Sequence, residues 1–483
     1  FSFDLLPSSA LDRIMVYKSG APELPGEFAG GIIELSTMAV PARNEVKVAY
    51  GMGIRSGTTF HEMQTDQTGK TDFLGFDDGS RSLPADFPAH LNTVTDPGQL
   101  AALGRELPNT WRPTSHKAGP DQRFSLLIAR RFGKENAKAS FGNVTAIDLS
   151  NTSAGYTAQN YNYNAFDAAT GLNDTIYRYS DQENVRTARL GVMHNWSALI
   201  GTGSKLEFRN LFNQVGQNQT TVRTGQNMEA GFDERDFAFR YTQRTLYSGQ
   251  LQGRHDLMED RTHLDWTLSY GLALGKEPDY RRIRTVRTIG ESDAPFQVVI
   301  APTASTLDAG RFYSDLNERT MTGKLGLARD LGNPDDGKLS AVVRMGGLAE
   351  RKDRNFSARW MSFRKANSAQ FDPALGSLPP TSIFNAANIN GTDGFKLEEG
   401  TNPSDRYTAA NTLIAGYAGT TVKWAKLFVL SGGVRVEHNR QELDGATYGG
   451  ANVRVDQPLT HVLPSVNASW NRSEKRRVGK ECR

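Results

Sequence analysis

The chain has 483 residues, 56 of them basic and 53 acidic, which leaves a formal net charge of +3. So small an excess indicates neither a nucleic-acid-binding surface nor an acidic interaction tail. Hydrophobic residues make up 38% of the sequence, and no run approaches the roughly 18 consecutive apolar residues of a membrane-spanning helix. An α-helical membrane protein is therefore excluded, whereas a β-barrel is compatible because it exposes only every second residue to lipid.

No catalytic or metal-binding motif stands out. The only cysteine is Cys482, and the eight histidines are scattered, so we expect no disulfide and no metal or other cofactor site. The glycines of residues 51–57 have the wrong spacing for a dinucleotide site, and the SxxK match at 362–365 lies in a polar stretch. We predict that the protein is not an enzyme. Asp72, Asp77 and Asp78 form the densest acidic cluster, which could bind a cation or simply form a solvated turn.

Residues 1–40 read as the end of a small compact unit. Strand-forming residues at 14–18 and 32–37 flank a break at 19–22, and Gly30 with Gly31 permits a tight turn before the second strand. The chain opens without a signal peptide or an initiating methionine, so we expect that the natural start lies upstream.

From residue 46 the sequence alternates between apolar and polar residues. Val46, Val48, Tyr50 and Met52 share one face of a strand, because side chains on a strand alternate with a period of two. About twelve such strands are predicted, at 46–53, 123–132, 137–149, 187–198, 206–212, 241–257, 264–274, 312–331, 338–351, 406–424, 427–440 and 460–471. The fold class is therefore all-β and antiparallel.

The connections between these strands are predicted to alternate in length. Long loops at 55–121, 150–185, 218–236, 277–310 and 353–405 alternate with short turns at 133–136, 201–204, 258–262, 332–337 and 425–426. A transmembrane β-barrel has short turns on the periplasmic side and longer loops outside, so this rhythm favours an outer-membrane barrel. The long loop after the first strand agrees with a chain that starts on the periplasmic side.

The first 39 residues resemble the end of the plug domain of TonB-dependent outer-membrane receptors. The resemblance rests on LPSSALDRIMVYKSG (6–20) and ELPGEFAGGIIELST (23–37). Weaker similarities lie at 72–84, 278–285, 432–439 and 463–470. The resemblance implies a plug within a 22-stranded barrel in the outer membrane of a Gram-negative bacterium. The chain would hold the end of the plug (1–40), about twelve barrel strands (41–471) and a basic tail (472–483) that looks non-native.

Three groups of candidate functional residues follow. Plug–barrel contacts are expected from Arg13, Glu27 and Glu34, although local salt bridges would explain these residues as well. Charged residues on strand faces would line the lumen, where water or the plug can satisfy them, or would simply be hydrated; they are Arg189, Glu207, Arg209, Arg244, Arg254, Arg435 and Glu437. Ligand contacts in external loops, or aromatic residues at strand ends, are expected from Trp111, Tyr280, Arg281, Arg282 and Trp360.

By this resemblance the chain is expected to be part of a receptor that imports a scarce nutrient such as a siderophore, a cobalamin or an oligosaccharide. Its partners would be outer-membrane lipid, that ligand and the TonB–ExbB–ExbD system, which acts through the N-terminal region; no nucleic acid is expected. One alternative is a surface-binding or adhesion barrel that does not transport. Another is a soluble all-β enzyme such as a propeller, but the sequence lacks a repeat of about 40–50 residues.

Overall fold

A computed structural model describes residues 11–27, 30–41, 43–133, 139–166, 168–171, 173–258, 260–332, 339–424 and 428–470. The basic tail predicted at 472–483, with Cys482, lies outside these described residues. No helix in the described part of the chain is long and apolar enough to cross a membrane.

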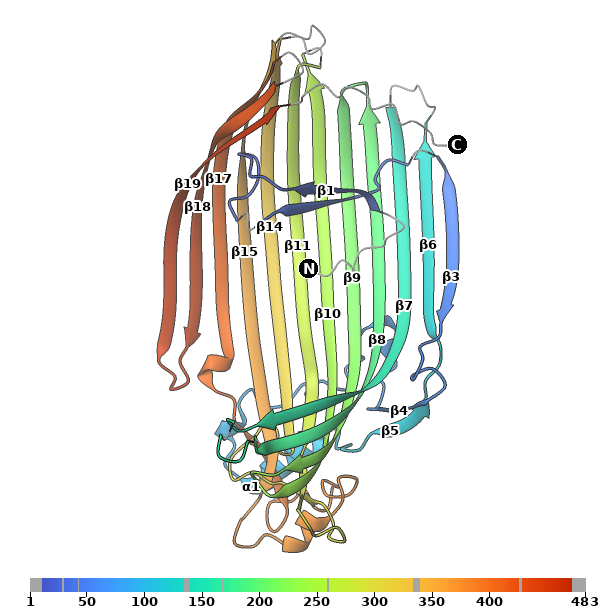
Figure 1. The fold of residues 1–483 in the computed structure, drawn as a ribbon, viewed down its shortest axis with the longest axis vertical. Helices are drawn as coiled ribbons and strands as arrows, with labels where there is room; N and C mark the ends of the chain where they lie inside the picture. The colour runs from blue at the N-terminus through green and yellow to red at the C-terminus, as the bar shows by residue number, and fades with distance from the viewer. Residues whose placement is uncertain are drawn as a thin grey trace.

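One large antiparallel sheet dominates the structure (Figure 1). Twelve long strands form the main path of this sheet, and each is hydrogen-bonded to the next strand in the path. The predicted all-β antiparallel fold is thus confirmed. The strands are β3 (Glu45–Gly53), β6 (Asp121–Phe132), β7 (Ala139–Tyr163), β8 (Thr175–Ile200), β9 (Ser204–Asn227), β10 (Phe232–Leu257), β11 (Thr262–Ile283), β14 (Gly310–Leu331), β15 (Leu339–Lys365), β17 (Arg406–Trp424), β18 (Phe428–Ala446) and β19 (Asn452–Trp470). Among the described residues β3 and β19 end the path and do not pair with each other, so the sheet is open.

Several strands are longer than predicted, at the expense of the loops. The predicted long loop at 218–236 is wrong, because β9 runs to Asn227 and β10 begins at Phe232. In this stretch the pairing of β9 with β10 continues, but both faces are polar. The sequence therefore lacks the apolar face that marks a strand. Tyr280, Arg281 and Arg282 accordingly lie on β11, and Trp360 lies on β15 rather than in a loop.

The two faces of the sheet differ in polarity. The strand register places Glu207 of β9, Gln252 of β10 and, farther across the sheet, Glu437 of β18 on the same face. We call the face with these residues the hairpin face, because β1 and β2 lie against it. The opposite, apolar face presents large exposed side chains, among them Trp196, Phe208, Leu251, Leu268, Met321, Met345, Ile414, Val434 and Val436.

The predicted N-terminal strands are present as β1 (Leu11–Tyr17) and β2 (Ile32–Thr37), which pair in antiparallel fashion. Gly30 has φ +118°, a conformation that glycine adopts without the strain of a side chain. Figure 1 shows the two strands lying crosswise in front of the long strands. The described residues before 40 contain no compact unit beyond this two-stranded sheet.

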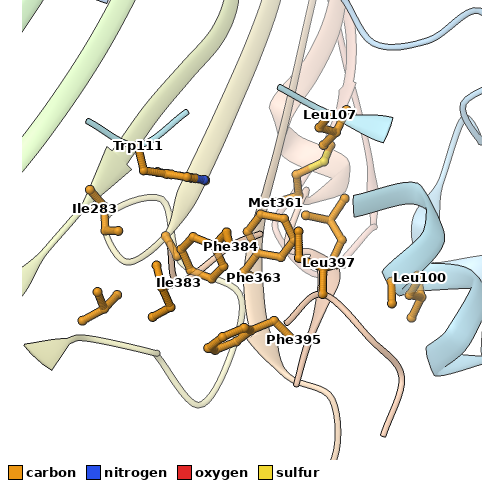
Figure 2. Close-up of a cluster of buried hydrophobic side chains, with 14 of the residues drawn as sticks. Leu100, Leu107, Trp111, Ile283, Met361, Phe363, Ile383, Phe384, Phe395 and Leu397 are labelled. Atoms are coloured by element: carbon orange, nitrogen blue, oxygen red, sulfur yellow. The ribbon is translucent and has the colours of Figure 1, made fainter. Parts of the chain in front are cut away.

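The long connections pack at one end of the long strands into what we call the loop layer. It contains β4 (Glu62–Thr65), β5 (Thr114–Lys117), α1 (Pro97–Glu106), β12 (Thr285–Thr288), β13 (Gln297–Val298) and β16 (Phe395–Glu399). Its hydrophobic core also includes Ile283 of β11 and Met361 and Phe363 of β15, and its strands β12 and β16 pair with β10 and β15. The helix α1 was not expected from the sequence. It begins with Pro97, and the Gln99 N–H donates a hydrogen bond to the Asp96 side chain (2.7 Å). Figure 2 shows Leu100 of α1, Trp111 and the rings of Phe363, Phe384 and Phe395 in this core.

Candidate functional site

All seven charged residues predicted to line a lumen lie on the hairpin face. Arg254 on β10 faces Lys205 on β9, and Arg244 faces Val215, which puts both on the side of Glu207 and Arg209. Arg189 pairs in register with Val215, and Arg435 shares its face with Glu437 two residues away. The structure thus brings these residues to one surface of the sheet.

Two of these residues hold the N-terminal segment. The Arg209 guanidinium donates to the main-chain oxygen of Thr37 (2.9 Å) and to Glu207 (2.9 Å). Glu437 accepts a hydrogen bond from the Gly26 N–H (3.0 Å) while it is paired with Arg435 (2.6 Å). The segment is therefore bound to the hairpin face mainly through its main chain.

Neutral amides, which were not predicted as contact residues, add to this attachment. Asn195 on β8 is fully buried and donates both to the Thr37 hydroxyl (3.1 Å) and to the Met38 oxygen (2.8 Å). Asn467 on β19 donates to the Gly20 oxygen (2.8 Å). An asparagine on a polar strand face carries no charge signal, so only its position opposite the segment identifies its role.

The three predicted contact residues of the N-terminal segment differ in their surroundings. Glu34 accepts a hydrogen bond from Tyr17 within the hairpin (2.9 Å), and Glu27 is exposed. Arg13 borders a cavity of about 240 Å³ that Glu207, Arg209 and Arg254 also line. Of the three, Arg13 thus lies beside the charged residues of the sheet.

A cavity of about 390 Å³ opens on the hairpin face at the ends of β8–β11 that adjoin the loop layer. Tyr280 and Arg282 line it, with the Arg282 guanidinium 4.9 Å from the Tyr280 ring centroid. No ion pair of Arg282 occurs among the described residues. Two of the five predicted ligand-contact residues therefore share one cavity.

The rest of this cavity mixes both signs of charge. Arg223 makes two hydrogen bonds of 2.8 Å to Asp181, and its guanidinium lies 4.6 Å from the Tyr179 ring centroid. Glu234 and Asp236 also line the cavity, and neither has an arginine or lysine partner in the described chain. Such a lining can bind a polar ligand through charge-assisted hydrogen bonds of either polarity.

Arg281 and Trp111 are buried outside this cavity, in one ionic network. Arg281 is paired with Asp66 (2.6 Å) and Asp279 (2.8 Å), and Asp279 is also paired with Arg311 (2.5 Å). The Arg311 guanidinium lies 5.1 Å from the Trp111 ring centroid. The network joins the first long loop to β11 and β14, and it leaves Arg281 and Trp111 only 3% and 1% exposed.

Trp360 takes part in a third set of contacts. Its indole N–H donates to Asp405 (3.0 Å), and its ring packs on Gly400. These contacts join β15 to the turn before β17, and no contact links Trp360 to the cavity with Tyr280 and Arg282 in the described chain.

The acidic cluster is occupied by an arginine. The Arg81 guanidinium binds Asp72 (2.7 and 2.9 Å) and Asp77 (2.9 Å). Asp78 accepts hydrogen bonds from Ser80 and from the Lys70 N–H, and these lower its pKa to about 2. Within the described residues no group of three or more histidine, cysteine, aspartate or glutamate residues is placed to bind a metal ion.

Comparison of the chain with protein-family models, with curated proteins and with solved structures gives no match in any of the three.

Proposed function

We propose that the chain is part of a TonB-dependent outer-membrane receptor that binds a scarce nutrient and imports it. The observation that carries the proposal is the difference between the two faces of the sheet. Across twelve neighbouring strands one face is apolar and exposed, while the other is polar and binds the N-terminal segment.

The apolar face supports an outer-membrane location. Leu268 is 58% exposed, Met321 60% and Val466 76%, although they lie on three different strands of the sheet. A soluble monomer rarely exposes contiguous apolar surface beyond a few hundred Å². Strands that alternate apolar-out and polar-in are the pattern of membrane barrels.

The hairpin face supports transport with the N-terminal segment as the moving part. The segment from Gly20 to Met38 is held by a small number of hydrogen bonds to Asn195, Arg209, Glu437 and Asn467. Net contributions of single hydrogen bonds are about 0.5–1.5 kcal/mol, so a mechanical pull can release them in sequence. The cavity beside Tyr280 and Arg282 would then receive the ligand, which we expect to be a siderophore, a cobalamin or an oligosaccharide.

Fractionation and uptake experiments on the full-length protein in its own host test the proposal. We expect the protein in the outer membrane, with slower gel migration after boiling, and nutrient uptake that is lost when the gene for TonB is deleted. Recovery of the protein from the soluble fraction would refute the membrane location.

The loop layer favours one rival, a surface-binding barrel that does not transport. Its buried core, from Phe87 to Leu397, gives the outer end a rigid surface for a protein partner. In that case binding of the partner to intact cells would persist unchanged without TonB, and no nutrient uptake would depend on the receptor.

A further inference from the structure

A third cavity, of about 440 Å³, lies on the apolar side of the sheet, away from the N-terminal segment. Its floor is made by β6–β10, and its other wall is made by residues 68–73 of the first long loop and by Gly119 and Pro120. The cavity is within the range of about 300–1,000 Å³ that ligand pockets span.

One row of side chains crosses its floor. Ser153, Arg186, Asn218 and Tyr241 are successive register partners on β7, β8, β9 and β10. Asn218 is an odd number of positions from Glu207 and Arg209 on β9, so its side chain points to the other face. The row therefore lies on the face opposite to the hairpin. This cavity is therefore separate from the one that Tyr280 and Arg282 line.

Two buried side chains in the row have polar atoms without a partner in the described chain. Asn218 is 4% exposed, and neither its amide oxygen nor its amide nitrogen is hydrogen-bonded. Tyr241 is 3% exposed, its hydroxyl is likewise unpaired, and its ring is fixed under the Arg81 guanidinium at 4.3 Å. Nearly all buried polar groups in proteins are hydrogen-bonded, so three such atoms in one cavity indicate that something polar binds there.

The lining indicates what kind of ligand fits. Neutral amides and hydroxyls come from side chains on this face and in the loop, namely Thr68, Gln122, Asn151, Ser153 and Asn218, whereas the register turns the side chains of Thr152 and Thr187 to the other face. Amides and hydroxyls both donate and accept, which matches a ligand whose groups also do both. Of the two charged residues in the lining, Asp72 is already bound by Arg81, whereas no ion pair of Arg186 occurs among the described residues. Phe73, which is 56% exposed, adds an apolar surface at the opening.

The position of the cavity relative to the apolar surface indicates where its ligand would come from. Asn218 lies ten positions beyond Phe208, an exposed residue of the apolar face, on the same face of β9, about 33 Å along the strand. In the outer-membrane orientation proposed above, this places the opening at or just beyond the polar surface of the outer leaflet.

We propose that this cavity binds a saccharide, through hydrogen bonds of its hydroxyl groups to Asn218 and Tyr241. The sugar is either part of a glycolipid of the outer leaflet or a free oligosaccharide. The position of the site relative to lipid rests on the proposed function, whereas its chemistry does not.

Equilibrium binding to the full-length protein in detergent tests the proposal with two probes. One is lipopolysaccharide, and the other is the lipid-free oligosaccharide that mild acid releases from it. Asn218→Leu removes both unpaired amide atoms at similar size, and we expect it to weaken binding about 10- to 100-fold. Tyr241→Phe keeps the ring under Arg81 and should weaken binding about 3- to 10-fold.

Asn184→Leu is the matched control. Asn184 is 2% exposed and has an unpaired amide nitrogen, like Asn218, but it lies outside the lining of the cavity. Binding of both probes, weakened by the two test variants but not by Asn184→Leu, supports a site for the sugar itself. The same pattern with lipopolysaccharide alone assigns the site to a glycolipid.

Binding of neither probe, or binding that the three variants affect equally, would overturn the proposal. The saccharide site and the proposed nutrient import can be refuted independently. Absence of TonB-dependent uptake would contradict only the proposed function.

Discussion

The carboxylate of Glu399 accepts a hydrogen bond of 2.7 Å from the main-chain N–H of Leu91, which lies 308 residues earlier in the chain. The same carboxylate binds Arg359 on β15 (2.9 and 3.0 Å) and the Thr401 hydroxyl (2.8 Å). Glu399 is 6% exposed and therefore links the first long loop, β15 and β16 inside the loop layer. Burial alone would raise the pKa of Glu399, but these hydrogen bonds and the Arg359 charge hold it below its usual value.

We predict that the loop layer loosens in acid. A carboxyl group whose pKa is lowered in the folded state contributes stability above its unfolded pKa of about 4.3, and this stability is lost as the pH falls through the folded value. The protection factor of the Leu91 amide, which compares its exchange rate with that of an unprotected amide at the same pH, should therefore fall below about pH 4. Glu399→Gln should lower this protection factor already at neutral pH, with a local loss of about 1–3 kcal/mol.

Glu398→Gln is the control for this prediction. Glu398 is paired with Arg364 next to Glu399, but both side chains are more than a quarter exposed, so less than about 1 kcal/mol should be lost. Equal acceleration at Leu91 in both variants would show that Glu399 has no special role.

A second prediction concerns the buried ionic network around Asp279. Asp279 is 2% exposed and is paired with both Arg281 and Arg311, so its removal leaves two buried cations with fewer partners. Asp279→Ala should destabilise the attachment of the first long loop by about 3–5 kcal/mol. Protease cleavage within residues 54–120 on intact cells should increase accordingly.

The more exposed ion pair of Arg240 and Glu277 provides the comparison. Its atoms are 2.7 Å apart, yet Arg240 is 44% exposed, so Glu277→Ala should change loop cleavage little. If Asp279→Ala also leaves cleavage unchanged, the network does not hold the loop.

The strands could be predicted from the sequence because alternation is a local signal. Leu264, Trp266 and Leu268 mark one face of β11 without knowledge of any other strand, and all twelve strands of the path were found in this way. The outer ends of the strands were missed where both faces are polar, as at 218–227 of β9. There the strand is stabilised by neighbours and by the loop layer, which no local pattern reveals.

The candidate sites were less predictable, because they depend on which loop covers which face. Arg281 and Arg282 are adjacent in the sequence, and both were predicted to contact ligand from an external loop. The strand places Arg282 in the cavity with Tyr280 and Arg281 on the opposite face, paired with Asp66. Asp66 is more than 200 residues away, and the sequence around it does not indicate this pairing.

A third prediction tests the close approach of the first long loop to β9. A Cβ atom at Gly216 would lie 2.6 Å from the Gly75 Cα and 2.6 Å from the Tyr241 hydroxyl oxygen. Because one of these neighbours is main chain, the loop must move, and Gly216→Ala should cost about 1–3 kcal/mol in urea unfolding of the detergent-solubilised protein.

Gly271→Ala separates this effect from a general effect of alanine in a strand. A Cβ atom at Gly271 would meet Thr320 at an ordinary distance of 3.6 Å. This variant should be neutral or stabilised by up to about 1 kcal/mol, since alanine loses less conformational freedom on folding. Similar destabilisation of both variants would contradict the proposed contact.

The last prediction tests the orientation of the sheet in a membrane at two adjacent residues of β11. Leu268 lies on the apolar face and is 58% exposed, whereas Ser269 is opposite Gln250 on the hairpin face. If the apolar face meets lipid, Leu268→Arg places a charge in hydrocarbon and should destabilise the full-length protein folded into lipid vesicles by about 2–4 kcal/mol. Ser269→Arg adds the same side chain to a polar surface and should cost far less. The difference between the two variants in urea titrations is the decisive measurement, because both have the same charge and size at neighbouring positions. Equal costs would mean that the apolar face packs against protein instead of lipid.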